Sequence, residues 1–431
     1  MLTRKKTYIE NIVSGEYLNG KLNFRYIVAL SVSSVLLIIG VLALWYTLQD
    51  GLIIWGIDNN ISWGFAIINF VFWIGIAHAG TLISAILYLL NQEWRISFNR
   101  MAELMTIIAI SIAAIFPLIH TGRPWFATYW LLPYYNQMGL LPNFKSALSW
   151  DIVAILTYFL LSLIFFYIGL LPDLSLLSSK IKNKTVNKLY RFLSDFWHGT
   201  KEQWEAHRAI YLIIAGLATP LVISVHSIVS FDFYVTLVKS WHTAILPPYF
   251  VLGAIFSGLA MVNVITIFYN YLNNSLDSIN IVHFDKLNKL MLFTSLAIAF
   301  IYFIELSTAF VDNKWTTDFA PLISGGIYVY LMLIFNVAFP LFLVFKRIRR
   351  NKLIVFITSI LVLIGMWLER YVIIITGQEG ATSTVENPLY TATIIDYMLV
   401  AGAFGAFLLL FLLIAKIFPI NSISERVIDE Q

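Results

Sequence analysis

Residues 27–46 read IVALSVSSVLLIIGVLALWY and contain no charged side chain. At a rise of 1.5 Å per residue, a helix of about 20 residues crosses the roughly 30 Å of hydrocarbon in a bilayer. Lipid offers the backbone no hydrogen-bond partners, and this run lacks the polar–apolar alternation of a barrel strand. The stretch therefore predicts a membrane-spanning α-helix.

The rest of the chain repeats this pattern. Of its 431 residues, 59% are hydrophobic and 12% are charged, against about 45–50% and 25% in soluble domains. Comparable apolar runs lie at about 27–48, 63–90, 102–121, 148–171, 208–230, 245–272, 288–310, 321–345, 352–376 and 391–416. We therefore predict an all-α polytopic membrane protein with about ten transmembrane helices, and we exclude a soluble domain.

Basic residues predict the orientation of these helices. If the N-terminus is cytoplasmic, 23 of the 28 Lys and Arg residues fall in inner segments, four in outer loops and one, Arg370, within a span. Because cytoplasmic loops of membrane proteins carry the excess of Lys and Arg, both termini are expected in the cytoplasm. We expect a cytoplasmic segment at 1–26 without a cleavable signal peptide, a transmembrane domain at 27–416 and a cytoplasmic tail at 417–431.

Three loops are long enough to carry interactions. The inner loop at 172–207 has a Lys-rich first half that predicts either a surface helix or a solvated connector near anionic lipid. The outer loops at 122–147 and 231–247 are rich in Trp, Tyr and Pro. Such loops serve either as interfacial anchors or as docking surfaces for a partner.

The chain contains no cysteine. Disulfides, thiolate-bound iron–sulfur clusters and Cys-ligated zinc are therefore excluded within it, and we expect no metal site. Since the basic residues are explained by membrane orientation, we expect no nucleic-acid partner.

Ionisable side chains within the spans are the candidate functional residues, because a charge near the bilayer centre is unfavourable by about 2.5–3.5 kcal/mol on insertion scales. His78 lies near the middle of the second span. The others lie near the expected outer surface: His120, Asp151, His226, Asp232, Glu305, Glu369, Arg370 and Asp396.

This outer layer suits a quinol, whose ring releases two protons with two electrons. A neutral histidine or a carboxylate can accept each proton, and an apolar cleft between helices suits the isoprenoid tail. Structural roles are the alternative: Asp151 and Asp232 as helix-end caps, and His78 as an interhelical hydrogen-bond partner. Glu369 and Arg370 are adjacent on a helix, so their side chains are expected to point about 100° apart.

Other function classes remain open from the residues alone. The chain could be a passive anchor and docking platform, or a transporter-like module that moves protons through His78 and Glu305. A bis-histidine haem needs two facing imidazoles, and His120 and His226 share an expected depth.

Seven stretches together resemble the NrfD/polysulfide-reductase-type membrane subunits, and most closely the ten-span quinol-binding subunit of alternative complex III. They are NFVFWIGIAHAGTLISAIL (69–87), NRMAELMT (99–106), FPLIHTGRPW (116–125), SVHSIVSFDF (224–233), WHTAILPPYFVLGAIFSGLAMV (241–262), GMWLERYVII (365–374) and LYTATIID (389–396). Because they run from the second span to the tenth, the resemblance covers most of the chain.

The resemblance implies two four-helix bundles, at about 63–230 and 245–376, plus two further helices. It implies a subunit of a respiratory electron-transport complex in the bacterial inner membrane. Menaquinol or ubiquinol is oxidised at the outer side of the first bundle, and electrons pass to an iron–sulfur subunit docked there. It also implies further membrane and cytochrome subunits, help with proton translocation, and no haem or iron–sulfur cluster in this chain.

Carried over by motif, the resemblance assigns residues to the quinol site. The catalytic candidates are His120 of HTGRPW, Asp151 of the WD pair, Asp232 of SFDF and Arg370 of GMWLER. Arg123 and His226 lie in the same motifs and join them as quinol-binding candidates, while the proton-path candidates are His78, Glu305, Glu369 and Asp396.

We expect the chain to act as part of a quinol-dependent oxidoreductase, with no redox cofactor of its own. The alternatives are a passive anchor with a degenerate quinol site, or a quinone-linked subunit of a polysulfide or molybdoenzyme reductase.

Overall fold

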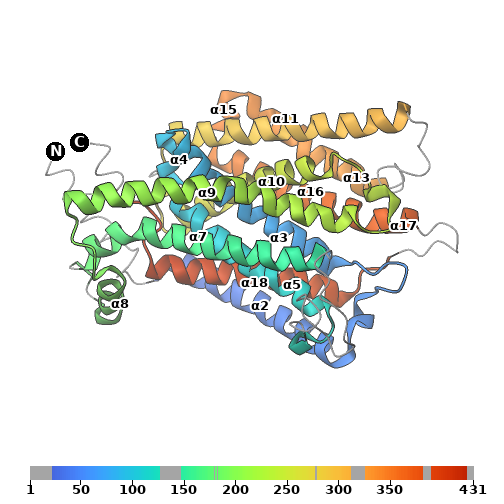
Figure 1. The fold of residues 1–431 in the computed structure, drawn as a ribbon, viewed down its shortest axis with the longest axis horizontal. Helices are drawn as coiled ribbons and strands as arrows, with labels where there is room; N and C mark the ends of the chain where they lie inside the picture. Colours follow the sequence, from blue (N-terminus) through green and yellow to red (C-terminus); the bar gives the residue numbers. More distant parts are fainter. Residues whose placement is uncertain are drawn as a thin grey trace.

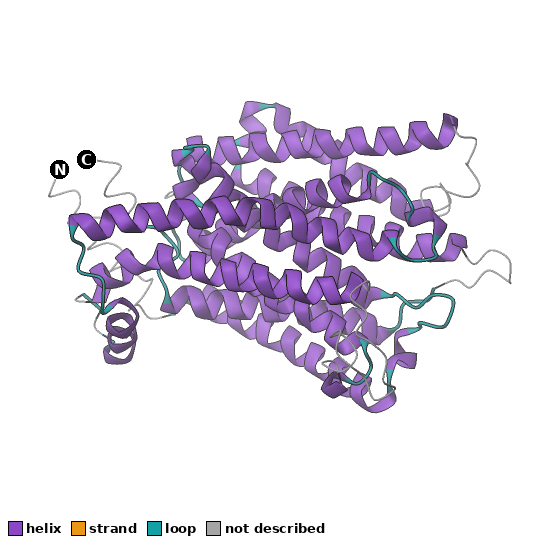
Figure 2. Ribbon diagram, viewed as in Figure 1, coloured by secondary structure: helices purple, strands orange, loops and turns teal. Residues whose placement is uncertain are grey.

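The computed structural model describes residues 22–126, 147–178, 180–181, 183–276, 279–311, 326–381 and 390–424. Within these ranges every regular element is a helix (Figure 2). The segment 1–21, most of the aromatic loop at 122–147 and the end of the tail at 425–431 lie outside the described residues.

Ten helices in the described chain are long and apolar enough to cross a membrane, which confirms the predicted all-α, ten-span fold. Seven of the ten spans lie within single helices: α2 (Phe24–Asp50), α5 (Asn99–His120), α7 (Ala147–Ser178), α9 (Lys201–Tyr234), α10 (Leu246–Leu272), α11 (Ile281–Val311) and α18 (Ile394–Ile417).

The other three spans each contain a π-helical turn. The helix α3 (Phe65–Thr81) passes through a turn at Leu82–Ile86 into α4 (Leu87–Leu89), α13 (Gly326–Leu333) through Ile334–Ala338 into α14 (Phe339–Leu341), and α16 (Lys352–Tyr371) through Val372–Thr376 into α17 (Gly377–Ala381). Two of these turns lie beside candidate residues, and π-turns within α-helices are frequent at functional sites.

Several helices extend further than the apolar runs predict, most of all α7, α9 and α11. The helix α7 continues through Pro172 to Ser178, whereas the apolar run predicted an end at about residue 171. The helix α9 begins at Lys201, where the Thr200 side chain accepts a hydrogen bond from the Gln203 N–H. Hydropathy detects only the part of a helix that lies in lipid, so polar extensions beyond it were missed.

The spans run side by side along the long axis of the molecule (Figure 1). The end where α2 begins and α18 ends is called the terminal face here, and the opposite end the distal face. Because consecutive spans run in opposite directions, α5, α9 and α16 end at the distal face, whereas α3, α7 and α18 begin there.

The helices pack as two rings and a pair. One ring consists of α3, α5, α7 and α9, and the second of α10, α11, α13 with α14, and α16. The rings join through α3 and α10, and α2 packs along α18 on the outside. Nearly every residue of α3 is buried, which explains why this helix is apolar on all sides.

Candidate functional site

Asp151 near the start of α7 and Asp232 near the end of α9 come together at the distal face. Both side chains are buried, and their carboxyl groups are hydrogen-bonded to each other. Such a bond requires a proton on at least one carboxyl group, because a carboxylate only accepts. Apart from this mutual bond, no N–H or hydroxyl group of the described chain donates to the Oδ1 atom of either residue.

His120 is the last residue of α5. Its ring stacks on Trp55, with ring centroids 6.0 Å apart, and the Trp55 Nε1–H donates to Thr47 Oγ1 at 2.9 Å. The buried His120 Nδ1 has no partner among the described residues. The imidazole is therefore oriented by an aromatic ring and keeps a ring nitrogen for another group.

His226 lies on α9, six residues before Asp232, and is fully buried. Its ring centroid is 4.2 Å from that of His78, and neither of its ring nitrogens has a partner in the described chain. The imidazole that it meets is thus His78, whereas His120 lies against Trp55.

The two ring nitrogens of His78 lie next to backbone carbonyl oxygens, Nδ1 at 2.7 Å from Ile74 O and Nε2 at 2.9 Å from Val222 O. A neutral imidazole donates only one hydrogen bond, while the imidazolium donates two. The neutral ring donates to one of these two oxygens and lies between the backbones of α3 and α9. The predicted interhelical hydrogen bond is present, since Val222 belongs to α9.

Glu369 and Arg370 were expected to point apart, but they form an ion pair with Nη1 to Oε1 at 2.6 Å. Both are almost fully buried, with 2% and 3% of their surface exposed. The arginine side chain is long enough to curl back around the helix, and Nη1 also donates to Met366 O one turn earlier. Gly253 of α10 leaves room for this pair, because a Cβ there would lie 3.0 Å from Arg370 Nη2.

Glu369 is the centre of a buried polar cluster in the second ring. Its Oε2 accepts hydrogen bonds from the Tyr302 hydroxyl and, at 3.4 Å, from Asn336 Nδ2 in a π-turn. Tyr249 is a further hydrogen-bond partner. Glu305 on α11 is close enough to Glu369 to interact with it electrostatically.

Two predicted residues lie apart from these groups. Asp396 forms a capping box at the start of α18, where its Oδ2 accepts from the Thr393 N–H at 2.9 Å and from the Tyr390 hydroxyl at 3.1 Å. Arg123 is exposed in the segment after α5. The structure thus gives Asp396 a structural role at the distal end of its helix.

Sequence reasoning missed a charged cluster near the terminal face. The buried Arg100 contacts Glu103 at 3.3 Å and Asp173 at 3.5 Å, and it donates to Gly169 O. Asp173 also accepts a hydrogen bond at 2.8 Å from the N–H of Ser424, in the segment that follows α18. The signal was available, because NRMAELMT contains both Arg100 and Glu103.

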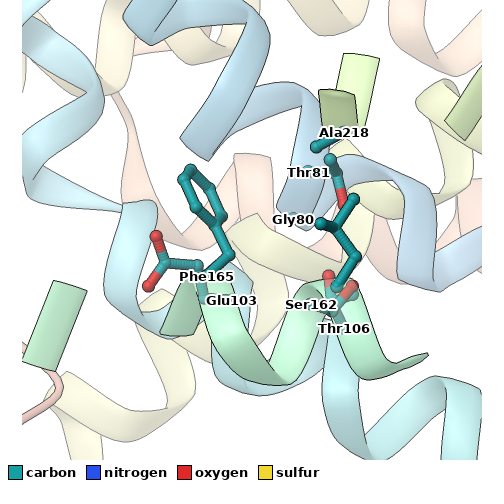
Figure 3. A pocket seen from close by; sticks show the side chains of 8 residues that line it. Gly80, Thr81, Glu103, Thr106, Ser162, Phe165 and Ala218 are labelled. Atoms are coloured by element: carbon teal, nitrogen blue, oxygen red, sulfur yellow. The ribbon is translucent and has the colours of Figure 1, made fainter. Parts of the chain in front are cut away.

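A cavity of about 10 Å³, enough for roughly one water molecule, lies inside the first ring (Figure 3). Glu103, Thr81 and Thr106 are among the residues that line it. The Tyr158 hydroxyl lies 2.7 Å from Thr81 Oγ1, and its ring lies 5.3 Å from His78. Polar groups therefore extend from the histidine pair towards the terminal face.

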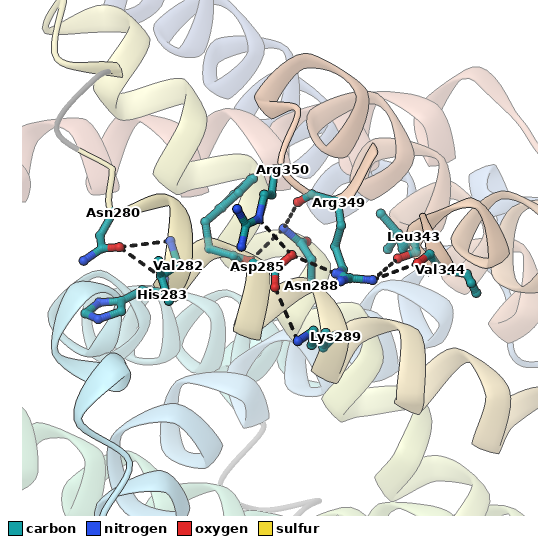
Figure 4. Close-up of polar contacts among 11 residues, drawn as sticks. Asn280, Val282, His283, Asp285, Asn288, Lys289, Leu343, Val344, Arg349 and Arg350 are labelled. Atoms are coloured by element: carbon teal, nitrogen blue, oxygen red, sulfur yellow. Dashed lines mark hydrogen bonds and ion pairs between the residues drawn. The ribbon is translucent and has the colours of Figure 1, made fainter. Parts of the chain in front are cut away.

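The second ring ends at the terminal face in a cluster around Asp285 (Figure 4). Asp285 Oδ1 accepts from Arg349 Nε at 2.9 Å and from Arg350 at 3.4 Å, and Lys289 lies 3.4 Å from Oδ2. Arg349 also donates to carbonyl oxygens at the end of the preceding span. These contacts link the turn before α16 to the start of α11.

An apolar cavity of about 420 Å³ lies between α3, α10, α16 and α18. Its lining includes Phe65, Phe72, Met261, Phe268, Trp367 and Phe404. Trp367 lies one turn before Arg370 on α16, so the cavity reaches the helix that carries a quinol-site candidate.

Among the described residues, no group of three or more His, Asp or Glu side chains is arranged to hold a metal ion.

Comparisons with known proteins agree with this architecture. A protein of Halobacterium salinarum, named provisionally as a membrane subunit of dimethyl sulfoxide reductase, is 25% identical over 356 residues, which cover 81% of this chain and 77% of that protein. A selenate reductase subunit from Mesobacillus selenatarsenatis is 25% identical over 239 residues, 54% of each chain. Residues 54–380 match the family described as polysulphide reductase, NrfD. Since this match covers most of the sequence and eight of the ten spans, all but α2 and α18, the chain belongs to the NrfD polysulphide reductase family.

Proposed function

We propose that this chain is the quinol-binding membrane subunit of a multi-subunit respiratory oxidoreductase, with its quinol site at the distal face of the first ring. The observation that carries the proposal is a set of buried polar atoms without partners in the described chain, on Asp151, Asp232, His120 and His226. Buried polar groups in native proteins are normally hydrogen-bonded. Their gathering near one end of a helix ring therefore supports a polar ligand there.

In the proposed site, different residues accept the two protons of the quinol. A bound quinol supplies two electrons and two protons. The hydrogen-bonded Asp151 and Asp232 already hold one proton between them and accept a second one from the quinol, and a histidine nitrogen accepts the other. Arg370, held by Glu369, supplies positive charge near His226.

The apolar cavity beside Trp367 has the chemistry of an isoprenoid binding site, because its described lining is entirely aliphatic, aromatic or thioether. We place the quinol tail there. Electrons leave at the distal face to an iron–sulfur subunit. We further infer that the terminal face, with its many basic residues, is cytoplasmic in a bacterial inner membrane.

Two kinds of complex can use such a subunit. The names of the two relatives favour a complex that oxidises quinol to supply a reductase of a sulfoxide or an oxyanion. The second candidate is a complex that supplies cytochromes, as in alternative complex III. Reduction of dimethyl sulfoxide or selenate by quinol in the purified complex would support the first candidate. Reduction of cytochrome bands by quinol would support the second.

The site is tested with Asp151→Asn and His120→Ala in the assembled complex. Because positioned acid–base groups contribute about 10²–10⁴-fold to rate, each variant is expected to slow quinol oxidation at least tenfold. Asp195→Asn, an exposed acid at the terminal face, is the matched control and is expected to keep the wild-type rate. Wild-type rates in both site variants would refute the assignment. Binding of a quinone analogue above lipid background separates this function from a passive anchor.

We also propose that the buried polar groups of the two rings help move protons. In the second ring, Ser295 Oγ donates to Asn336 O at 2.7 Å, and Asn288 Nδ2 donates to Arg349 O at 3.2 Å. These contacts extend the Glu369 cluster towards Asp285. The proton-to-electron ratio of the complex in proteoliposomes is expected to fall in Glu305→Gln. An unchanged ratio would count against a role for Glu305.

A further inference from the structure

The helix α8 (Lys184–Ser194) is the one amphipathic helix in the described chain that lies across the spans and not along them (Figure 1). It begins at an Asn183 cap, whose side chain accepts from the N–H groups of Thr185 and Val186. It lies at the terminal face, next to the ends of α7 and α18. That position is the level of the lipid headgroups if the spans cross the bilayer.

One side of α8 is fixed to the protein. Tyr190 is fully buried, and its hydroxyl donates to Ile417 O at 2.5 Å at the end of α18. Burial, together with the nearby Asp173 carboxylate, raises the pKa of Tyr190, so the hydroxyl keeps the proton that it donates. The Tyr167 hydroxyl also donates to Leu193 O at 2.8 Å. The orientation of α8 about its own axis is therefore set by the bundle.

The remaining surface of α8 is divided into two stripes. At about 100° per residue, Lys184, Lys188 and Arg191 lie within about 60° of one another. Leu189 and Phe192 occupy the next sector of about 60°, between the basic stripe and the docked side. Phe192 is 78% exposed and Leu189 is 38% exposed, and the three basic side chains are also exposed.

We propose that α8 is an interfacial helix that binds the anionic phospholipids of the leaflet at the terminal face. Phe192 and Leu189 insert at the boundary of headgroups and acyl chains, and the basic stripe binds lipid phosphates. Amphipathic helices with an aromatic stripe beside a Lys/Arg stripe have this mode of binding. The charge of α8 favours anionic lipid as the ligand, because the helix carries three cations and no acidic residue. The proposal is independent of the quinol site, which lies at the opposite face.

The absence of cysteine from the chain allows a direct test. A nitroxide is attached to Phe192→Cys in the full-length chain, reconstituted in vesicles of phosphatidylcholine with or without phosphatidylglycerol. With the anionic lipid, we expect higher accessibility to oxygen and lower accessibility to a nickel chelate, as for a site below the headgroups. A label at Glu202→Cys, exposed at the same face, is the control and is expected to stay in water.

The basic stripe is tested with Lys184→Gln, Lys188→Gln and Arg191→Gln together. Each basic residue contributes about fivefold to binding of an anionic surface, so the triple variant is expected to lose nearly all preference for phosphatidylglycerol. Lys201→Gln, Arg208→Gln and Lys286→Gln remove three exposed charges outside α8 and are expected to leave the Phe192 depth unchanged. A label that stays in water in both vesicles overturns the proposal. Protection that arises only with partner subunits also overturns it, by assigning the stripe to a protein.

Discussion

Gly80 shows how tightly the histidine-bearing helix is packed. A Cβ at this position would overlap Thr106 Oγ1 and the Ala102 carbonyl oxygen on α5. Thr106 uses that hydroxyl to donate to Ala77 O at 2.6 Å. Close approach of α3 and α5 therefore depends on the missing side chain, as at other contacts between membrane helices.

Gly80→Ala is expected to destabilise the protein by about 1–3 kcal/mol, the usual effect of overpacking. Gly216→Ala on α9 is the control, because nothing lies within 4 Å of the added Cβ. It is expected to be neutral or to stabilise by about 0.5–1 kcal/mol through helix propensity. The free energy of unfolding in mixed micelles measures both effects. Equal stability of the two variants would contradict this account of the α3–α5 contact.

The sequence predicted which single residues belong to the candidate site, but not which side chains they contact. The sequence indicated that Asp151, Asp232, His120, His226 and Arg370 belong to one layer, because helix direction sets depth. Trp55 beneath His120 was not predicted, since it lies in a short connecting turn and its contact depends on how that turn folds back.

At the scale of elements, the pair α2 and α18 depends on two glycines that face each other. A Cβ on Gly40 would overlap Gly402 Cα, and a Cβ on Gly402 would overlap Gly40 Cα. The two backbones are therefore in contact at this level. Neither helix shows this from its own sequence, because both are apolar on all sides.

Gly40→Val is expected to push α2 away from α18 and to lower stability by about 1–3 kcal/mol. Val41→Leu, at an exposed neighbouring position, is the matched control and is expected to leave stability within about 0.5 kcal/mol. Thermal unfolding of the purified protein, monitored by limited proteolysis of α2, distinguishes the two variants. If Gly40→Val unfolds like the control, the glycine contact does not hold the pair together.

At the scale of the whole molecule, the alternating direction of ten spans places both described ends of the chain at one face. The Lys and Arg distribution predicts that this terminal face is cytoplasmic. Thr185 is exposed at the terminal face and Asn59 is exposed in the loop before α3 at the distal face.

Single variants Thr185→Cys and Asn59→Cys are expected to react with a membrane-impermeant maleimide from opposite sides. Because the chain has no other cysteine, labelling reports only the introduced residue. We expect Thr185→Cys to be labelled in inside-out vesicles and Asn59→Cys in right-side-out vesicles. The reverse pattern would invert the topology and would move the proposed quinol site to the cytoplasmic side.

The sequence by itself determined the helical class and the number of spans, and it predicted a level for each ionisable residue. It could do so because bilayer thickness sets helix length and because lipid leaves the backbone no alternative to internal hydrogen bonds. Only the tertiary structure decided which residues meet: Asp151 with Asp232, His78 with His226, and Glu369 with Arg370. Those pairs depend on the rotation of each helix about its axis and on side-chain packing between helices. A nearly uniform apolar pattern around a buried helix such as α3 carries no information about that rotation.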